Sequence, residues 1–284
     1  MTWLSPKALC RHHKLAPKKS LGQNFLVHPD QARRLVAALE VQPQDTVVEI
    51  GAGLGALTLL LAQEARQVVA LELDCGLIAV LEGEVLAGRE NVQVVCQDAL
   101  TFDFAGLSRR QGSPLAIIGN LPYQITSPLF FKLLADKAAL RVMVLMMQLE
   151  VGERLVALPG GKDYGILSVL LQYHFRLEKL FSLSPGNFYP APRVDSVVLR
   201  FFPQTPPLPA RDEAYFTRLV KAAFATRRKT LKNCLSGQAA SLGLAPAALP
   251  DILRTLDLDP GRRPETLSVL DFVRLSNAIQ ELGG

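Results

Sequence analysis

The stretch TVVEIGAGLGALT (residues 46–58) decides the fold of this chain. Its first half is apolar and β-branched, which is typical of a buried strand, and the residues after Gly55 follow a helical pattern. The glycines Gly51, Gly53 and Gly55 let the backbone turn tightly and approach a ligand, while a helix N-terminus offers free N–H groups. A strand, a glycine loop and a helix in this order predict an α/β sheet that binds a nucleotide-like cofactor.

Further apolar runs follow, separated by helical patterns, and we interpret them as strands at residues 67–73, 92–96, 115–119 and 141–148. Strands separated by helices imply right-handed crossovers and a largely parallel sheet. Two later runs, residues 174–183 and 196–202, are joined by a Pro/Gly-rich loop without a helix and are expected to pair antiparallel.

The 284 residues suit one core domain and a smaller one. QTPPLP (residues 204–209) is typical of a linker, and the sequence after it is helix-like. We therefore expect a disordered tail over residues 1–16, a catalytic domain over 17–204 and a small helical domain over 205–284.

Charge is distributed unevenly along the chain. Residues 1–34 carry a net charge of +6, residues 35–204 a net −4 and residues 205–284 a net +3. The basic charge at the two ends is therefore compatible with binding of a polyanion, although solvated basic tails would give the same pattern.

The cysteines and histidines give no sign of a metal site. The four cysteines are scattered without a C-x-x-C pair, which argues against zinc and disulfides and fits a reducing cytoplasm. His12 and His13 adjoin each other in the expected tail, and we assign them no metal. The longest apolar stretch, residues 142–147, is too short to cross a bilayer, so we expect no membrane contact.

Two acids follow predicted strands. Glu72 ends the second strand 21 residues after Gly51, where a carboxylate can accept hydrogen bonds from two ribose hydroxyls. Asp98 follows the third strand, where an adenine edge would lie, although it could also cap a helix. The pattern fits either NAD or S-adenosylmethionine.

The sequence Gly-Asn-Leu-Pro-Tyr (residues 119–123) directly follows the fourth predicted strand and favours methyl transfer. An aromatic amine is a poor nucleophile because its lone pair is delocalised, and acceptors for its N–H bonds would aim that lone pair at a methyl donor. Asn120 supplies a side-chain carbonyl, and Pro122 fixes a turn that presents a backbone carbonyl. Tyr123 supplies a ring on which a flipped base can stack. A plain turn with a core tyrosine is the alternative.

With these motifs the chain resembles the small-subunit ribosomal RNA adenine dimethyltransferases, the family associated with kasugamycin resistance. The resemblance spans about Pro17 to Leu275 and rests on KKSLGQNFL (18–26), VVEIGAGLGALT (47–58), LELD (71–74), QDAL (97–100), GNLPYQITSPLFFKLL (119–134), DYGILSV (163–169), NFYPAPRVDSVVLRF (187–201), TRRKTLKNCL (226–235) and RPETLSVLDF (263–272).

The resemblance implies a Rossmann-like class I methyltransferase sheet with a small C-terminal helical domain. It also implies S-adenosyl-L-methionine as cofactor and dimethylation of two adjacent adenosines near the 3′ end of small-subunit rRNA. The protein would be a monomer in the cytoplasm, and its partner would be an immature ribosomal subunit.

The resemblance assigns a role to each matched residue. Asn24 and Leu26 would close over the cofactor, Gly51 and Gly53 would lie against it, Glu72 would hold the ribose and Asp98 would contact the adenine amine. Asn120, also near the cofactor, and the Leu121 carbonyl would receive the target amine, between the rings of Tyr123 and Phe188. Without the resemblance, a core aromatic anchoring its loop is the favoured interpretation of Phe188.

Basic residues at both ends are predicted to contact rRNA phosphates, with a solvated helix face as the alternative. They are Lys18, Lys19, Arg227, Arg228, Lys229 and Lys232, of which the last four are expected on a helix.

Three positions depart from the family pattern: Ala52 where proline is common, Gln124 where asparagine is frequent, and Leu149 where a basic residue is usual. Two rival functions remain. One is a large-subunit rRNA adenine methylase of the macrolide-resistance type, which shares the glycine loop and the Asn-x-Pro-Tyr turn. The other is a non-catalytic ribosome-assembly or RNA-binding factor.

Overall fold

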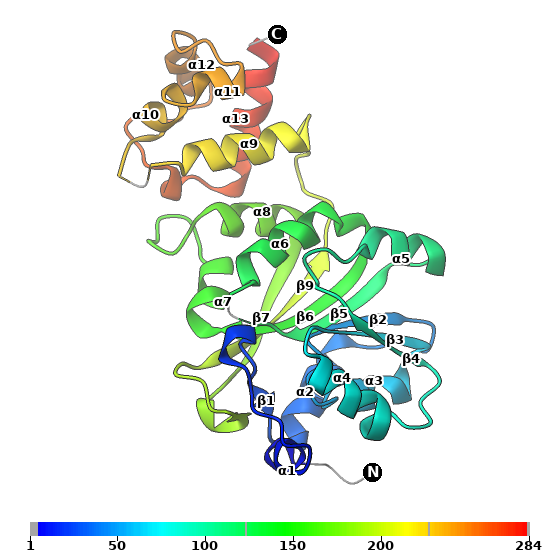
Figure 1. The fold of residues 1–284 in the computed structure, drawn as a ribbon. Coiled ribbons are helices and arrows are strands. Elements are labelled where there is room, and N and C mark those ends of the chain that lie inside the picture. Colours follow the sequence, from blue (N-terminus) through cyan, green and yellow to red (C-terminus); the bar gives the residue numbers. More distant parts are fainter. Residues whose placement is uncertain (1–4, 123, 227, 283–284) are drawn as a thin grey trace. The chain divides into compact units, whose positions relative to one another are not determined.

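A computed structural model describes residues 5–122, 124–226 and 228–282 of the chain. Its contacts group into two compact units, which are described separately (Figure 1). The first comprises Met1–Gly152 and Arg176–Pro203, and the second comprises Glu153–Phe175 and Gln204–Gly284.

The first unit is built on a seven-stranded sheet with the strand order β4-β3-β2-β5-β6-β9-β7. The β2–β3, β2–β5, β3–β4 and β5–β6 pairs are parallel, whereas β9 runs antiparallel to β6. This confirms the predicted α/β fold with a mostly parallel sheet. The strands of this sheet are β2 (Thr46–Ile50), β3 (Gln67–Glu72), β4 (Val92–Cys96), β5 (Leu115–Asn120), β6 (Leu140–Gln148), β7 (Phe175–Leu183) and β9 (Ser196–Pro203).

A separate two-stranded ribbon joins distant parts of the chain: β1 (Phe25–Leu26) pairs antiparallel with β8 (Phe188–Tyr189). Helices cover both faces of the large sheet, with α2 and α3 on one face and α5 and α6 on the other (Figure 1). The helices that begin in this unit are α1 (Pro6–His12), α2 (Pro29–Leu39), α3 (Thr58–Glu64), α4 (Cys75–Val80), α5 (Phe104–Gln111), α6 (Thr126–Ala135) and α7 (Leu149–Leu155), with short turns η1 (Lys19–Leu21), η2 (Leu81–Val85), η3 (Lys137–Ala139) and η4 (Pro185–Asn187).

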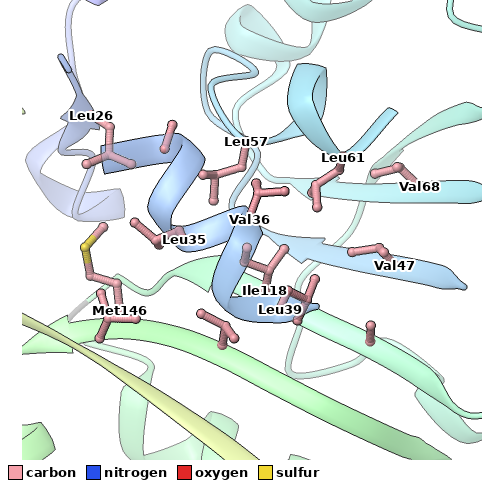
Figure 2. Packing of buried hydrophobic residues seen from close by; sticks show 14 of the residues in the cluster. Leu26, Leu35, Val36, Leu39, Val47, Leu57, Leu61, Val68, Ile118 and Met146 are labelled. Carbon is pink, nitrogen blue, oxygen red and sulfur yellow. The ribbon is translucent and has the colours of Figure 1, made fainter. Parts of the chain in front are cut away.

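The main core of this unit lies between α2 and the sheet (Figure 2). Leu35, Val36 and Leu39 recur at helical spacing on α2 and are fully or almost fully buried. They pack in one cluster with sheet residues that include Val47 and Ile118. Burying a side chain of this size contributes about 1.5–3 kcal/mol, which fixes α2 against the sheet.

Strand register brings the predicted site residues to one edge of the sheet. Ile50 lies opposite both Leu71 on β3 and Gly119 on β5, and β4 pairs with Glu72 through Cys96. The carboxyl ends of these strands therefore meet where the strand order reverses between β2 and β5. Open α/β sheets bind ligands at this kind of crevice.

The second unit is helical and has its own aromatic core. Phe216 and Phe272 are fully buried, and the Phe272 ring lies 5.7 Å from that of Phe224. Among the described residues, no helix combines the length and apolarity needed to span a membrane. The helices of this unit are α8 (Ile166–His174), α9 (Glu213–Ala223), α10 (Leu231–Ser236), α11 (Ala239–Leu242), α12 (Leu249–Thr255) and α13 (Val269–Leu282), with η5 (Pro264–Thr266).

The structure differs from the sequence prediction at the N-terminus. Residues 6–12, expected in a disordered tail, form α1, and Leu9 and Cys10 are buried in a cluster with Phe25 and Leu77. A helix of seven residues, in which Pro6, Leu9 and Cys10 are buried, gives too short a periodic pattern to predict a packed helix, which explains the error.

Domain organisation also differs in one segment. The predicted linker at 204–209 begins where the second unit resumes, but residues 153–175 group with the C-terminal helices as well. In α8, Val169 and Leu171 are fully buried, and the Tyr173 ring lies 4.6 Å from that of Phe216 on α9. In the sequence, the α8 segment lies between two predicted strands of the sheet, so the pattern did not indicate that it belongs to the second unit.

Candidate active site

The glycine loop takes the left-handed conformation that its composition predicts. Gly51, Gly53 and Gly55 have φ values of +76°, +58° and +81°, a region that residues other than glycine rarely adopt. The N–H groups of Gly51 and Ala52 both donate to the Leu71 carbonyl, at 2.9 and 3.0 Å. The loop is therefore tied directly to the end of β3.

Glu72 is the carboxylate that organises this edge. It is only 8% exposed; its Oε2 accepts from the Gly53 N–H at 2.9 Å, and its Oε1 accepts from the N–H groups of Leu73 and Asp74 at 2.8 and 2.9 Å. A carboxylate has about four lone pairs, of which these three N–H groups use two on Oε1 and one on Oε2, so acceptor capacity for a hydroxyl donor remains on Oε2. The predicted ribose contact is compatible with this geometry, and the same carboxylate also holds the glycine loop.

Glu49 is a second acid at the cavity and is not among the site residues predicted from the sequence. It is 1% exposed on β2, lines the cavity and accepts from the Thr58 hydroxyl at 2.6 Å. Burial raises the pKa of the Glu49 carboxyl to about 8, and the negative charge of Glu72 adds to the rise. A charged residue inside an otherwise apolar strand, two positions before the glycine loop, was the available signal.

Asp98 lies in the turn after β4 and lines the same cavity. Its Oδ1 accepts from the Leu100 N–H at 2.9 Å, so it shapes a local turn. It does not cap a helix, because α5 begins at Phe104 behind its own cap, Asp103. The helix-cap alternative for Asp98 is therefore wrong, and the adenine contact stays a prediction.

Asn120 ends β5 with a defined side-chain orientation. Its Nδ2 donates to the Asn24 carbonyl at 2.7 Å. Because a carbonyl can only accept, this bond assigns the nitrogen end of the amide and leaves Oδ1 as the acceptor for another group. The next residue, Leu121, is buried and donates its N–H to the Met146 carbonyl at 2.9 Å, which anchors the turn to β6.

The segment before α2 approaches this edge from the N-terminal side. Asn24 and Leu26 both line the cavity, although Leu26 is 3% exposed and belongs mainly to the core. Phe25 lies so close to the glycine loop that a Cβ at Gly53 would sit 3.1 Å from its ring. The predicted closure of this segment over the cofactor site is compatible with its position.

The two rings assigned to the target base have different outcomes. Tyr123 lies outside the described residues. Phe188 pairs with Leu26 in the β1–β8 ribbon, is 5% exposed and packs into the core, and it is not among the described residues that line the cavity. In this conformation the structure supports the anchoring interpretation of Phe188, because a ring packed in the core offers no face to a base.

One cavity of about 370 Å³ lies at this edge of the sheet, in the range of small-molecule and cofactor sites. Its lining includes the predicted residues Asn24, Leu26, Gly51, Gly53, Glu72, Asp98 and Asn120. The glycine loop, a carboxylate with spare acceptor capacity and the apolar walls together fit an adenosyl cofactor such as S-adenosylmethionine.

Those predicted RNA-binding residues that the structure describes are exposed, but their local structure differs from the expectation. Arg228 and Lys229 lie in the loop after α9 ends at Ala223, and only Lys232 lies on a helix, α10. Arg227 lies outside the described residues. Thr230 caps α10 through the Asn233 N–H, which ends the loop and explains why the basic run is not helical.

At the N-terminus the two lysines differ. Lys19 is exposed in η1, whereas the Lys18 ammonium lies 2.8 Å from an oxygen of the buried Asp74 carboxylate. Nearby, His12 and His13 adjoin Glu84, with all three potential ligand atoms within 4.8 Å of one another. A 2.8 Å hydrogen bond between His13 Nε2 and Glu84 Oε2 accounts for this proximity, so the cluster is assigned no metal.

Known proteins and a family model match nearly the whole chain. The model of the ribosomal RNA adenine dimethylase family matches residues 14–257. A Geobacter metallireducens protein named ribosomal RNA small subunit methyltransferase A is 43% identical over 276 residues, covering 96% of this chain and 99% of the relative. A Moorella thermoacetica protein of the same name is 44% identical, covering 96% of each chain.

Solved structures agree with the fold. A dimethyladenosine transferase from Plasmodium falciparum superposes with a TM-score of 0.74 at 26% identity, covering 88% of this chain and 95% of that one. The 23S rRNA methyltransferase ErmE gives a TM-score of 0.68 at 25% identity, covering 90% and 100%. Because the family model matches residues 14–257 and these relatives are covered along nearly their whole length, this chain belongs to the ribosomal RNA adenine dimethylase family.

Proposed function

We propose that this chain transfers methyl groups from S-adenosylmethionine to the 6-amino groups of two adjacent adenosines near the 3′ end of small-subunit rRNA. The names of the relatives at 43% and 44% identity support the small subunit over the large one. In this proposal the protein acts as a monomer on an immature ribosomal subunit in the cytoplasm, as part of ribosome biogenesis.

The orientation of Asn120 is the observation that carries the proposal. Its Nδ2 is engaged by the Asn24 carbonyl, so Oδ1 is available at the cavity edge to accept an N–H of the target amine. The Leu121 carbonyl would accept the second N–H. Two acceptors would favour a pyramidal nitrogen whose lone pair is no longer delocalised into the base.

The remaining residues hold and orient the reactants. S-adenosylmethionine, when bound, supplies an electrophilic methyl group. Glu72 would hold its ribose hydroxyls, Asp98 would accept from its adenine amine, and Asn24 would close the cavity above it. No general base is needed before transfer, because the amine becomes acidic only once it is alkylated, and its proton can then leave to solvent.

Methyl mapping tests the proposal. The protein is incubated with labelled S-adenosylmethionine and, in parallel reactions, with immature small subunits or with large subunits, and the methylated nucleotides are located in each rRNA. We expect dimethyladenosine at two adjacent positions near the 3′ end, and much slower formation of both products with Asn120→Ala. Label in large-subunit rRNA would favour the macrolide-resistance type of activity, and cofactor binding without transfer to either subunit would favour a non-catalytic assembly factor.

A further inference from the structure

A buried carboxylate just outside the predicted cofactor contacts connects two parts of the site. Asp74 follows β3 and is 5% exposed. Its Oδ1 accepts from the Lys18 ammonium at 2.8 Å and from the Gly76 N–H at 3.0 Å, and its Oδ2 accepts from Gln23 Nε2 at 2.9 Å. Its own N–H donates to Glu72 Oε1 at 2.9 Å. Asp74 therefore contacts both Glu72, the residue predicted to bind the ribose, and a segment more than fifty positions earlier in the chain.

That segment, residues 18–26, is held at both ends. At its start, the Lys18 N–H donates to Gln23 Oε1 at 2.7 Å, so the two side chains that reach Asp74 belong to one closed turn. At its end, the Asn24 carbonyl accepts from Asn120, and β1 pairs with β8. The segment thus runs from the ribose edge of the cavity to the predicted position of the target amine.

The pKa values of Asp74 and Lys18 both shift in the direction that a specific ion pair produces. Burial by itself raises the pKa of Asp74, but the hydrogen bonds from Lys18 and Gln23 outweigh it, and the pKa lies below its ordinary value. The same hydrogen bond raises the pKa of Lys18. A buried carboxylate that loses its cationic partner keeps the cost of burial without the compensating attraction, so the pair resists separation.

We propose that Asp74 is a positioning residue that holds the 18–26 segment over the cofactor cavity through Lys18 and Gln23. In this arrangement Lys18 serves cofactor retention and not contact with rRNA phosphates. The inference rests on the proposed function only in taking the cavity as the S-adenosylmethionine site. It assigns Lys18 and Lys19, adjacent residues of the same type, to different tasks.

The experiment compares K18M with K19M in the full-length protein. Methionine keeps most of the length of the lysine side chain but removes the charge. Binding of S-adenosylmethionine and S-adenosylhomocysteine is measured by calorimetry, cofactor KM and kcat by methyl transfer, and the salt dependence of RNA binding by titration. Wild-type cofactor binding is established first, because its absence would refute the proposed function and not the role of Asp74.

We expect K18M to weaken binding of both cofactor forms roughly fivefold and to raise the cofactor KM in proportion, with kcat nearly unchanged. The salt slope of RNA binding should stay at the wild-type value. K19M should leave cofactor affinity unchanged, and K18R, which keeps the charge, should restore most of the affinity lost in K18M.

D74N provides a second, independent measurement. It should weaken cofactor binding at least as much as K18M, and combining it with K18M should add little, because both variants break the same contact. Full additivity of the two losses would overturn the proposal. So would a K18M protein with wild-type cofactor affinity and a salt slope for RNA reduced by about 1, which would identify Lys18 as a phosphate contact. K18M remains decisive if D74N does not fold, because the Lys18 side chain is 54% exposed.

Discussion

Replacing Glu49 with glutamine should change how the free energy of unfolding depends on pH. The pKa of this buried carboxyl is about 8 in the folded protein, against an ordinary value of 4.5. Between these two pH values the folded protein holds a proton that the unfolded chain has released, so rising pH destabilises the wild type. Below pH 4.5 both states are protonated, and above pH 8 the loss is complete.

The magnitude follows from the difference between the two pKa values. Each unit corresponds to about 1.4 kcal/mol, so the full loss between pH 4.5 and 8 is about 3–5 kcal/mol. Glutamine is neutral throughout and can still accept from the Thr58 hydroxyl, so Glu49→Gln should escape this loss. Its stability relative to the wild type should therefore rise by about 1.4 kcal/mol for each pH unit across the window.

Urea unfolding at pH 5, 6, 7 and 8, followed by circular dichroism, measures this difference. Glu64→Gln is the matched control, because it removes a carboxylate from an exposed position at the end of α3 and should show no comparable trend. A stability difference between Glu49→Gln and the wild type that stays constant from pH 5 to 8 would refute the reasoning, since it would mean that Glu49 does not take up a proton on folding.

Three further predictions concern the reaction. Asn120→Ala should raise the methyl-transfer barrier by about 2–4 kcal/mol with little change in cofactor or RNA affinity, because the lost bond strengthens in the transition state; single-turnover assays that separate mono- and dimethyladenosine test this, and near-normal rates for both would contradict it. Glu72→Ala should weaken S-adenosylmethionine binding by roughly 1–3 kcal/mol, and unchanged affinity by calorimetry in a folded variant would remove Glu72 from the site. Neutralising Arg228 and Lys229 together should weaken RNA binding and lower its salt slope by about 1–2, and an unchanged slope would place the docking surface elsewhere.

The sheet was predictable from sequence because each of its parallel strands is a short apolar run that ends at a turn or a polar residue. TVVEI (46–50) became β2 with the predicted bounds, and the strands ending at Glu72, Cys96 and Asn120 differ from prediction by at most one residue. Because the carboxyl ends of parallel strands lie at one edge of the sheet, the residues that follow these strands lie close together. Local pattern and simple topology therefore sufficed for the fold and for the wall of the cavity.

Features that depend on contacts between distant residues were not predictable in this way. The Lys18–Asp74 pair joins residues whose proximity depends on how the 18–26 segment crosses the sheet edge, and neither residue carries a local sign of a partner. The raised pKa of Glu49 depends on complete burial, which a single charged letter in a strand does not reveal. The packed position of Phe188 likewise follows from its pairing with Leu26, far away in sequence.

The grouping of α8 with the C-terminal helices has a consequence for synthesis of the chain. The ribosome completes α8 before the sheet strand β9, but its packing partners on α9, among them the Phe216 ring that lies 4.6 Å from the Tyr173 ring, begin only at Glu213. Until then this apolar helix lacks them, and a nascent chain of this kind needs protection from association. A recombinant fragment cut at residue 204 would lack these partners permanently, so we expect it to associate more readily than the full-length chain, which size-exclusion chromatography of the two would show.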